Sequence, residues 1–302
     1  MNMPKRSFLV GLLLPFVILL VSVLGFSQVQ PVRPAQDVTV QALKAVDQKL
    51  NSKLMGREMP YRVVLPRGYD DKVNTSVKYP VIYLLHGLSG NYTNWTDRSK
   101  LLQYANDHKF IIVTPEGANG WYSDSVSIPT DRFETYIVNE LIPEIEKKYR
   151  TFTDRDHRVI GGLSMGGYGA LKFGLKYPEM FSLAGSFSGA LGAAAWTEKV
   201  VPGIGKSIDA ILGPDGSDAR TANDIFRFIR EIAPEKLQAL PFIYQSCGTE
   251  DFLIKFNRDY LALLNEKKVP HEYREHPGIH DLVFWDDQIR EFLDLAERRM
   301  KK

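Results

Sequence analysis

The residues best suited to do chemistry surround Ser164, in the run Gly-Leu-Ser-Met-Gly at 162–166. An apolar run at 158–160 precedes this segment, and a stretch compatible with a helix, 169–175, follows it. A strand that passes through G-x-S-x-G into a helix is typical of the nucleophile elbow, a strained turn that holds a serine hydroxyl above a sheet. The positions two before and two after the serine crowd this turn, so both must be very small. The pattern predicts a nucleophilic Ser164; a glycine-rich turn is the structural alternative.

A base for Ser164 is expected near the carboxyl terminus. A serine hydroxyl is a weak nucleophile at neutral pH, so it needs a base, and the base needs an orienting acid. His280 is the expected base, because it follows a Pro-Gly turn after the strand expected near 272–274 and precedes the last helix. His276, four residues earlier, is the competing candidate.

The orienting acid is expected directly after the apolar run 241–245. Asp251 is the preferred residue, and the adjacent Glu250 is expected to point in a different direction. The structural alternative is that these carboxylates favour the positive end of the helix that begins near Ile254.

Two backbone N–H groups are expected to stabilise an oxyanion. Met165 follows the nucleophile directly, and Leu88 lies in the glycine-containing segment 85–90 after an early strand. An ordinary glycine-rich loop is the alternative for that segment. His86 is expected to organise the loop rather than to act as a catalyst.

Candidates for a substrate-binding surface are aromatic: Trp95, Trp121, Tyr122 and Trp196. The pair at 121–122 follows the strand expected at 110–113 and should rise on the catalytic edge of the sheet, although packing of the loop is an equally weighted alternative. The apolar stretches 191–196 and 200–204 can line an acyl or aryl pocket or form a short cap helix. The histidines lack zinc-type spacing, and no P-loop or dinucleotide fingerprint occurs, so neither a metal nor a cofactor is expected.

Buried strands that alternate with amphipathic helices predict the architecture that must position these residues. The expected class is α/β, with a mainly parallel, doubly covered central sheet, a short insertion near 190–240 and no large lid domain. Residues 38–54 fit either a helical stripe or, in their second half, a hairpin with 61–65 across a turn at Gly56; the hairpin is preferred. Strands are expected at 81–85, 110–113, 158–160, 183–187, 241–245 and 272–274, and helices at roughly 131–149, 166–177, 256–267 and 283–299.

The amino terminus reads as a separate segment. Lys5 and Arg6 precede an apolar run from 8 to 26 that ends in a small-x-small pattern, which predicts a signal peptide over 1–27 or an uncleaved membrane anchor. A flexible leader is expected over 28–44 and the catalytic domain over 45–302, outside the cytoplasm. The single cysteine permits no internal disulfide. A net charge of +2, which falls to zero without 1–27, gives no electrostatic reason to expect nucleic acid binding.

Together these motifs resemble an esterase family of α/β-hydrolases. This group includes esterase D and S-formylglutathione hydrolases, feruloyl and acetylxylan esterases, tributyrin-type esterases and mycolyltransferases. The resemblance covers about 45–298 and depends on 83–87, 162–167, 248–253 and 278–280. It implies an α/β-hydrolase fold with the same nucleophile, acid, base and oxyanion donors. The chain departs from the cytosolic S-formylglutathione hydrolases in its export signal and in an oxyanion loop without cysteine, so a role in formaldehyde detoxification is not expected.

The function expected from residues and resemblance is that of an exported serine carboxylesterase. Its partner would be a small ester, with a short acyl, aryl or acyl-sugar group, and it would meet a membrane only through an uncleaved anchor. One alternative is an acyltransferase in which a sugar hydroxyl replaces water. A second is a non-catalytic binding module, against which the complete set of Ser164, Asp251 and His280 argues. The sequence leaves the oligomeric state open.

Overall fold

The computed structural model describes residues 43–300 of the 302-residue chain. The predicted signal peptide or anchor, 1–27, and the expected leader up to residue 42 lie outside the described residues. Within 43–300, no helix combines the length and the apolar character needed to cross a membrane.

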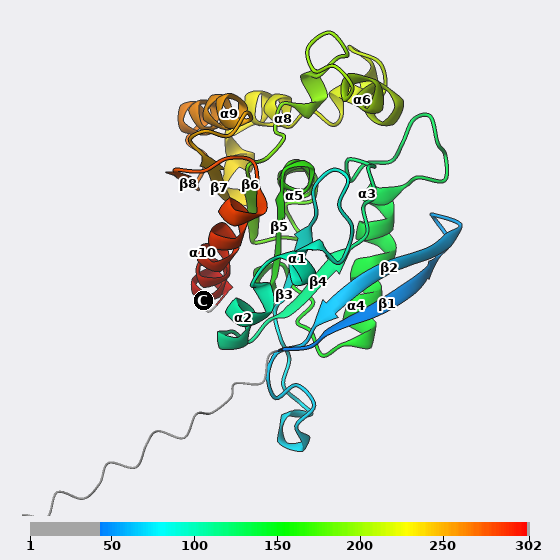
Figure 1. The fold of residues 1–302 in the computed structure, drawn as a ribbon, viewed down its shortest axis with the longest axis vertical. Helices are drawn as coiled ribbons and strands as arrows, with labels where there is room; N and C mark the ends of the chain where they lie inside the picture. Colours follow the sequence, from blue (N-terminus) through cyan, green and yellow to red (C-terminus); the bar gives the residue numbers. More distant parts are fainter. Residues whose placement is uncertain (1–42, 301–302) are drawn as a thin grey trace, which may run out of the picture. The chain divides into compact units, whose positions relative to one another are not determined.

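An eight-stranded sheet forms the centre of the described residues, with the order β1-β2-β4-β3-β5-β6-β7-β8 (Figure 1). All pairings from β4 to β8 are parallel, whereas β2 pairs antiparallel with both β1 and β4. All six strands expected from apolar runs are present, as β3 to β8. The strands are β1 (Ala45–Ser52), β2 (Arg57–Val64), β3 (Val81–Leu85), β4 (Ile111–Pro115), β5 (Arg158–Leu163), β6 (Leu183–Phe187), β7 (Phe242–Gly248) and β8 (His271–His276).

Helices cover both faces of this sheet. Successive residues of a strand point to opposite faces, and β3 shows the consequence: Tyr83 and Leu85 join one apolar cluster, whereas Ile82 and Leu84 join the other. The first cluster includes side chains of α4, α5 and α9, and the second includes side chains of α1, α2 and α10. The principal helices are α1 (Asn94–Arg98), α2 (Leu101–Tyr104), α3 (Phe133–Tyr136), η3 (Ile137–Leu141), α4 (Ile142–Lys148), α5 (Met165–Lys176), α9 (Ile254–Lys267) and α10 (Leu282–Met300).

The amino-terminal hairpin settles the ambiguity at 38–54. Residues 45–52 are a strand whose Leu50 faces Met59 of β2, so the hairpin is confirmed and a helix over these residues is wrong. Gly56, in the connecting turn, has φ +63°, a backbone conformation that glycine adopts without steric cost. The inward side chains of β2, including Tyr61 and Val63, are fully buried and fix its register.

The expected insertion lies between β6 and β7. Its first part approaches Ser164, since Ala190, Trp196 and Ile204 line the pocket above it. Its second part runs beside α5, where α8 packs against both α5 and α9. Across residues 43–300 the insertion adds only short helices and forms no separate lid domain: η5 (Ala193–Ala195), α6 (Gly205–Leu212), α7 (Asp218–Thr221), α8 (Ile225–Glu231) and η6 (Pro234–Ala239).

Candidate active site

Ser164 occupies a strained turn between β5 and α5, as the motif predicts. Its backbone has φ 52° and ψ −115°, which is unusual for a residue with a side chain. A Cβ atom on Gly162 would lie 2.4 Å from the carbonyl carbon of Gly166, and one on Gly166 would lie 2.4 Å from the carbonyl oxygen of Leu85. The turn is therefore closed so tightly that both flanking positions must be glycine.

Neighbouring backbone holds this strained conformation in place. The N–H of Ser164 donates to the carbonyl of Phe187 at 2.9 Å, and the carbonyl of Ser164 accepts from the N–H of Ala190 at 3.0 Å. Both partners lie at the end of β6 or just beyond it. The segment at the end of the adjacent parallel strand therefore holds both the N–H and the C=O of the serine.

The loops after β7 and β8 bring an acid and a base to this serine. Nε2 of His280 lies 3.0 Å from Oγ of Ser164, and Nδ1 of His280 lies 2.8 Å from Oδ2 of Asp251. Because Nδ1 donates its proton to the carboxylate, the Nε2 lone pair is left facing the serine hydroxyl. This arrangement can remove a proton from Ser164 and stabilise the resulting imidazolium.

The competing residues lie elsewhere. His276 is the last residue of β8, and its Nε2 lies 3.9 Å from a carboxylate oxygen of Glu291 on α10. Glu250 accepts a hydrogen bond from the N–H of Gly278 at 2.7 Å, so it shapes the loop that carries the base. The geometry therefore favours His280 and Asp251 over their neighbours.

Asp251 is held as a buried carboxylate. Burial alone would raise its pKa, but hydrogen bonds from the His280 ring and from the N–H of Leu253, at 2.8 Å, more than offset burial and keep the pKa below the ordinary value. A carboxyl group that stays ionised can hold the imidazole in one tautomer and orientation. The His280 ring is also packed between Phe252 and Trp285, at centroid distances of 4.5 and 4.9 Å.

The two expected oxyanion donors lie beside Ser164. Met165 is the first residue of α5, and the N–H groups of a helix's first turn have no acceptor within the helix. Leu88 lines the pocket above Ser164. His86 organises this loop: its Nδ1 lies 2.8 Å from the carbonyl oxygen of Gly87, and its Nε2 accepts from the N–H of Gly117 at 2.9 Å. The histidine therefore ties the loop after β3 to the loop after β4.

A cavity of about 510 Å³ opens above Ser164. Trp121 and Trp196, both expected to face substrate, line it and pack edge to face at a centroid distance of 6.0 Å. Among the other wall residues, sequence reasoning missed Asn94, Arg98 and Trp285, which no motif marks.

The other two aromatic candidates, Trp95 and Tyr122, are not in the pocket wall. Trp95 is 1% exposed and packs in the apolar cluster of α10, where its indole N–H donates to the carbonyl of Leu85 at 3.0 Å. Tyr122 is fully buried, and its hydroxyl donates to the carbonyl of His86 at 3.0 Å. The structure therefore assigns both residues to support of the loop after β3, in place of the expected contact with substrate.

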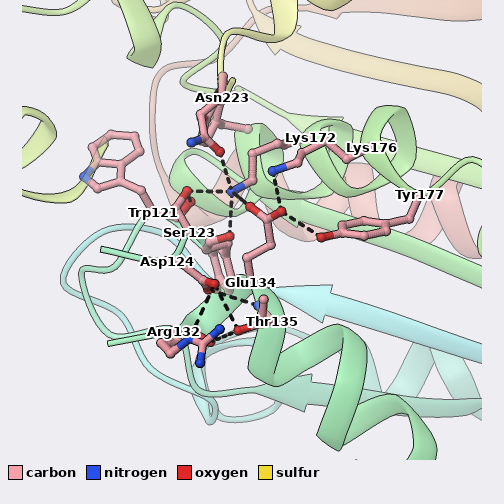
Figure 2. A network of polar contacts seen from close by, with 12 residues as sticks. Trp121, Ser123, Asp124, Arg132, Glu134, Thr135, Lys172, Lys176, Tyr177 and Asn223 are labelled. Atoms are coloured by element: carbon pink, nitrogen blue, oxygen red, sulfur yellow. Dashed lines mark hydrogen bonds and ion pairs between the residues drawn. The ribbon is translucent and has the colours of Figure 1, made fainter. Parts of the chain in front are cut away.

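A buried lysine fixes the loop that carries Trp121 (Figure 2). Lys172 of α5 is fully buried, and its ammonium group donates to the carbonyl of Tyr122 at 2.7 Å, to the hydroxyl of Ser123 at 2.5 Å and to Glu134 at 2.7 Å. Trp121 and Tyr122 both have φ near +51°, a conformation that costs free energy for such large residues. The lysine thus connects the helix that follows the nucleophile to a strained segment of the pocket wall.

The pKa values of the charged groups in this network are strongly shifted. Full burial lowers the pKa of Lys172 to about 8, although Glu134 opposes the shift. Burial would raise the pKa of Glu134, but Lys172 and Lys176 together lower it to about 2. The pKa of Glu134 falls because its carboxylate lies next to two ammonium groups. The pKa of Lys172 falls because the group is buried and because the second cation, Lys176, disfavours its positive charge. At neutral pH both groups are ionised.

The described residues 43–300 contain no cluster of three or more histidine, cysteine or acidic side chains suited to a metal ion. A mainly parallel sheet with a serine at the β5–α5 turn, and with a histidine and an aspartate on later loops, defines the class of α/β-hydrolases.

Comparison with known proteins narrows this class. Residues 52–294 match the sequence model of the family described as "Putative esterase". An acetyl esterase of Caldicellulosiruptor saccharolyticus is 31% identical over 252 residues, which cover 79% of this chain and 92% of that relative. A solved ferulic acid esterase superimposes with a TM-score of 0.74 at 28% identity, covering 86% of this chain and 99% of its own. MPT51 of Mycobacterium tuberculosis, at 15% identity and a TM-score of 0.71, covers 85% of this chain and 99% of its own and shares the fold alone.

The chain belongs to this esterase family. It is a hydrolase of carboxylic esters.

Proposed function

We propose that this protein is an exported carboxylesterase in which Ser164 is the nucleophile, His280 the base and Asp251 the orienting acid. The observation that carries the proposal is the continuous hydrogen-bonded path from the serine hydroxyl through the imidazole to a buried carboxylate, with steps of 3.0 and 2.8 Å. A serine in an ordinary turn needs neither a strained backbone nor this pair of partners.

The proposed reaction proceeds in two halves. Oγ of Ser164 attacks the ester carbonyl while Nε2 of His280 takes its proton, and the N–H groups of Leu88 and Met165 stabilise the negative oxygen that forms. His280 then gives the proton to the departing alcohol, which leaves an acyl group on the serine. In the second half, His280 takes a proton from water, the water attacks the acyl group, and the acid is released as Ser164 recovers its proton.

Short acyl and aryl esters are the proposed substrates. The support comes from the aromatic wall of Trp121 and Trp196 around a cavity of about 510 Å³, a volume in the range of small-ligand sites. An acetyl esterase and a ferulic acid esterase are among the relatives. A hydrolysis panel of acetyl, butyryl, decanoyl and feruloyl esters tests this proposal: a marked preference for the decanoyl ester would contradict it.

The test of the catalytic assignment is the rate of phenyl acetate hydrolysis by Ser164→Ala and His280→Ala. Each substitution is expected to lower kcat about 10⁴-fold or more, since members of such a unit act together. His276→Ala is the matched control, because it removes a nearby histidine that lies next to Glu291 instead. A silent His280→Ala with an inactive His276→Ala would transfer the role of base.

Export is the remaining part of the proposal, and it is supported by Lys5, Arg6 and the apolar run 8–26. We expect the full chain to leave the cytoplasm and to lose its first 27 residues. Cell fractionation with amino-terminal sequencing measures both outcomes. An intact amino terminus in the membrane fraction would indicate an anchor, and an intact chain in the cytoplasm would contradict export.

A further inference from the structure

The active-site pocket is lined by side chains of different chemistry. The loop after β4 and the insertion contribute the apolar side chains of Trp121, Trp196 and Ile204. The helix α1, which follows β3, contributes the polar side chains of Asn94 and Arg98. An ester has an acyl part and an alcohol part, so one part can contact the apolar side chains while the other contacts the polar ones.

Arg98 is the charged member of this polar pair. It is the last residue of α1 and is exposed, and within residues 43–300 its guanidinium has neither an ion-pair nor a hydrogen-bond partner. The nearest acid in sequence, Asp97, forms an ion pair with Arg62. Lys100, two residues further on, pairs with Asp286 at 3.4 Å. A cation is thus left available at the pocket while its neighbours are paired.

Asp281 is the acidic side chain that lines the same pocket. Its carboxylate accepts a hydrogen bond from the N–H of Phe284 at 3.1 Å, in the first turn of α10. A carboxylate at a helix amino terminus is stabilised by the helix dipole and by such N–H groups. The negative charge of Asp281 is therefore engaged by its own helix.

The side-chain amide of Asn94 can supply a second hydrogen-bond donor to a ligand, beside the guanidinium of Arg98. Its Oδ1 accepts from the N–H of Asn91 at 3.2 Å, which leaves the amide Nδ2 free of that bond. A planar guanidinium with a nearby amide matches the two oxygens of a carboxylate, which accept two parallel hydrogen bonds. Neutral aliphatic groups would gain nothing from this surface.

We propose that Arg98 and Asn94 form a subsite for a carboxylate carried by the ester substrate. This inference rests on the proposed ester hydrolysis and narrows its substrate class to esters that combine an apolar or aryl part with a negatively charged part. Arg98 and Asn94 line the same pocket as Ser164, so a carboxylate bound at this subsite would hold the ester at the nucleophile.

Two pairs of matched esters test the subsite. The pair 4-carboxyphenyl acetate and 4-carbamoylphenyl acetate places the charge on the alcohol, whereas phenyl hydrogen succinate and phenyl succinamate place it on the acyl group. For each pair, the ratio of kcat/KM for the charged ester to that for the neutral ester is measured. Because each ratio is compared between variants, the intrinsic reactivities of the esters cancel.

Arg98→Gln is expected to lower this ratio about threefold to tenfold in one of the pairs, mainly through KM, which is the range for a partly exposed charge-assisted contact. Arg98→Glu should lower it further, and added salt should weaken the preference of the wild type. The control is Lys100→Gln, which removes a nearby cation that does not line the pocket and should leave the ratio unchanged.

The pair that responds identifies which half of the ester meets Arg98. Ratios that stay within the error of the wild type in both pairs, or that fall equally in Lys100→Gln, would overturn the subsite. A wild-type protein that hydrolyses none of the four esters would instead refute the proposed function, so the two failures are distinguishable.

Discussion

Replacement of Lys172 by methionine tests how the pocket wall is held. Methionine keeps the length and the apolar stem of the side chain but removes the ammonium group. The substitution leaves the carbonyl of Tyr122, the hydroxyl of Ser123 and the side chain of Asn223 without a donor, and each of these groups is at least nine-tenths buried. It also removes one of the two cations that face Glu134.

The expected loss is about 3–5 kcal/mol of unfolding free energy, the range for removal of one partner of a buried pair. Two effects act in opposite directions. Each unpaired oxygen adds about 1–3 kcal/mol to the loss of unfolding free energy, whereas the variant is relieved of the cost of burying an ammonium ion. This loss is a large part of the roughly 5–15 kcal/mol by which domains are stable. With an m-value of about 1–3 kcal/mol per M in urea, the urea midpoint should fall by about 1 M or more. Lys176→Met is the matched control, because Lys176 pairs with the same carboxylate but is 23% exposed, so its loss should be smaller.

The same variant should alter catalysis through the pocket wall. Without Lys172, the strained backbone at Trp121 and Tyr122 is free to relax, so KM for aryl esters should rise severalfold more than kcat falls. A Lys172→Met protein with a free energy of unfolding within about 1 kcal/mol of the wild type, and with unchanged KM, would refute this reasoning.

Three further predictions follow from the site. The pKa of Glu134, near 2 against an ordinary 4.5, means that its contribution of about 3 kcal/mol is present above pH 4.5 and is lost as the pH falls toward 2; acid unfolding of Glu134→Gln should therefore show a shallower pH dependence in this range, and an unchanged profile would contradict the shift. Gly166→Ala places a Cβ 2.4 Å from the carbonyl oxygen of Leu85, so it should displace Ser164 and lower kcat more than tenfold, while urea unfolding shows a loss of about 1–3 kcal/mol; wild-type activity would show that the turn can relax. Asp251→Asn removes the charge that orients His280 and should lower kcat about 10³- to 10⁴-fold with little change in KM, and a loss below tenfold in steady-state assays would exclude the aspartate from this role.

Much of the fold could be predicted because buried parallel strands leave continuous apolar runs. The elbow, the order of Ser164, Asp251 and His280, and the loops that carry them all follow from short local patterns. The hairpin at β1 and β2 was ambiguous because Leu43, Val46, Leu50 and Leu54 fit a helical period as well as a strand.

Residues whose roles depend on distant contacts could not be predicted. Trp95, Trp121 and Tyr122 all follow early strands and are all buried. What separates them is the surface that each contacts: Trp95 packs in the cluster of α10 and Tyr122 bonds to the carbonyl of His86, whereas Trp121 lines the pocket. Lys172 lies in a helix whose only other charged residue is Lys176, and its partner Glu134 is 38 residues away. Arg98 carries no motif, since its availability depends on how the surrounding acids are paired.

Activation of Ser164 by His280 is tested most directly by reaction of the protein with a fluorophosphonate, followed by peptide mapping by mass spectrometry. We expect one stoichiometric adduct on Ser164, absent from Ser164→Ala and formed at least about 100-fold more slowly in His280→Ala. An adduct on another residue, or labelling of Ser164→Ala at the wild-type rate, would contradict it.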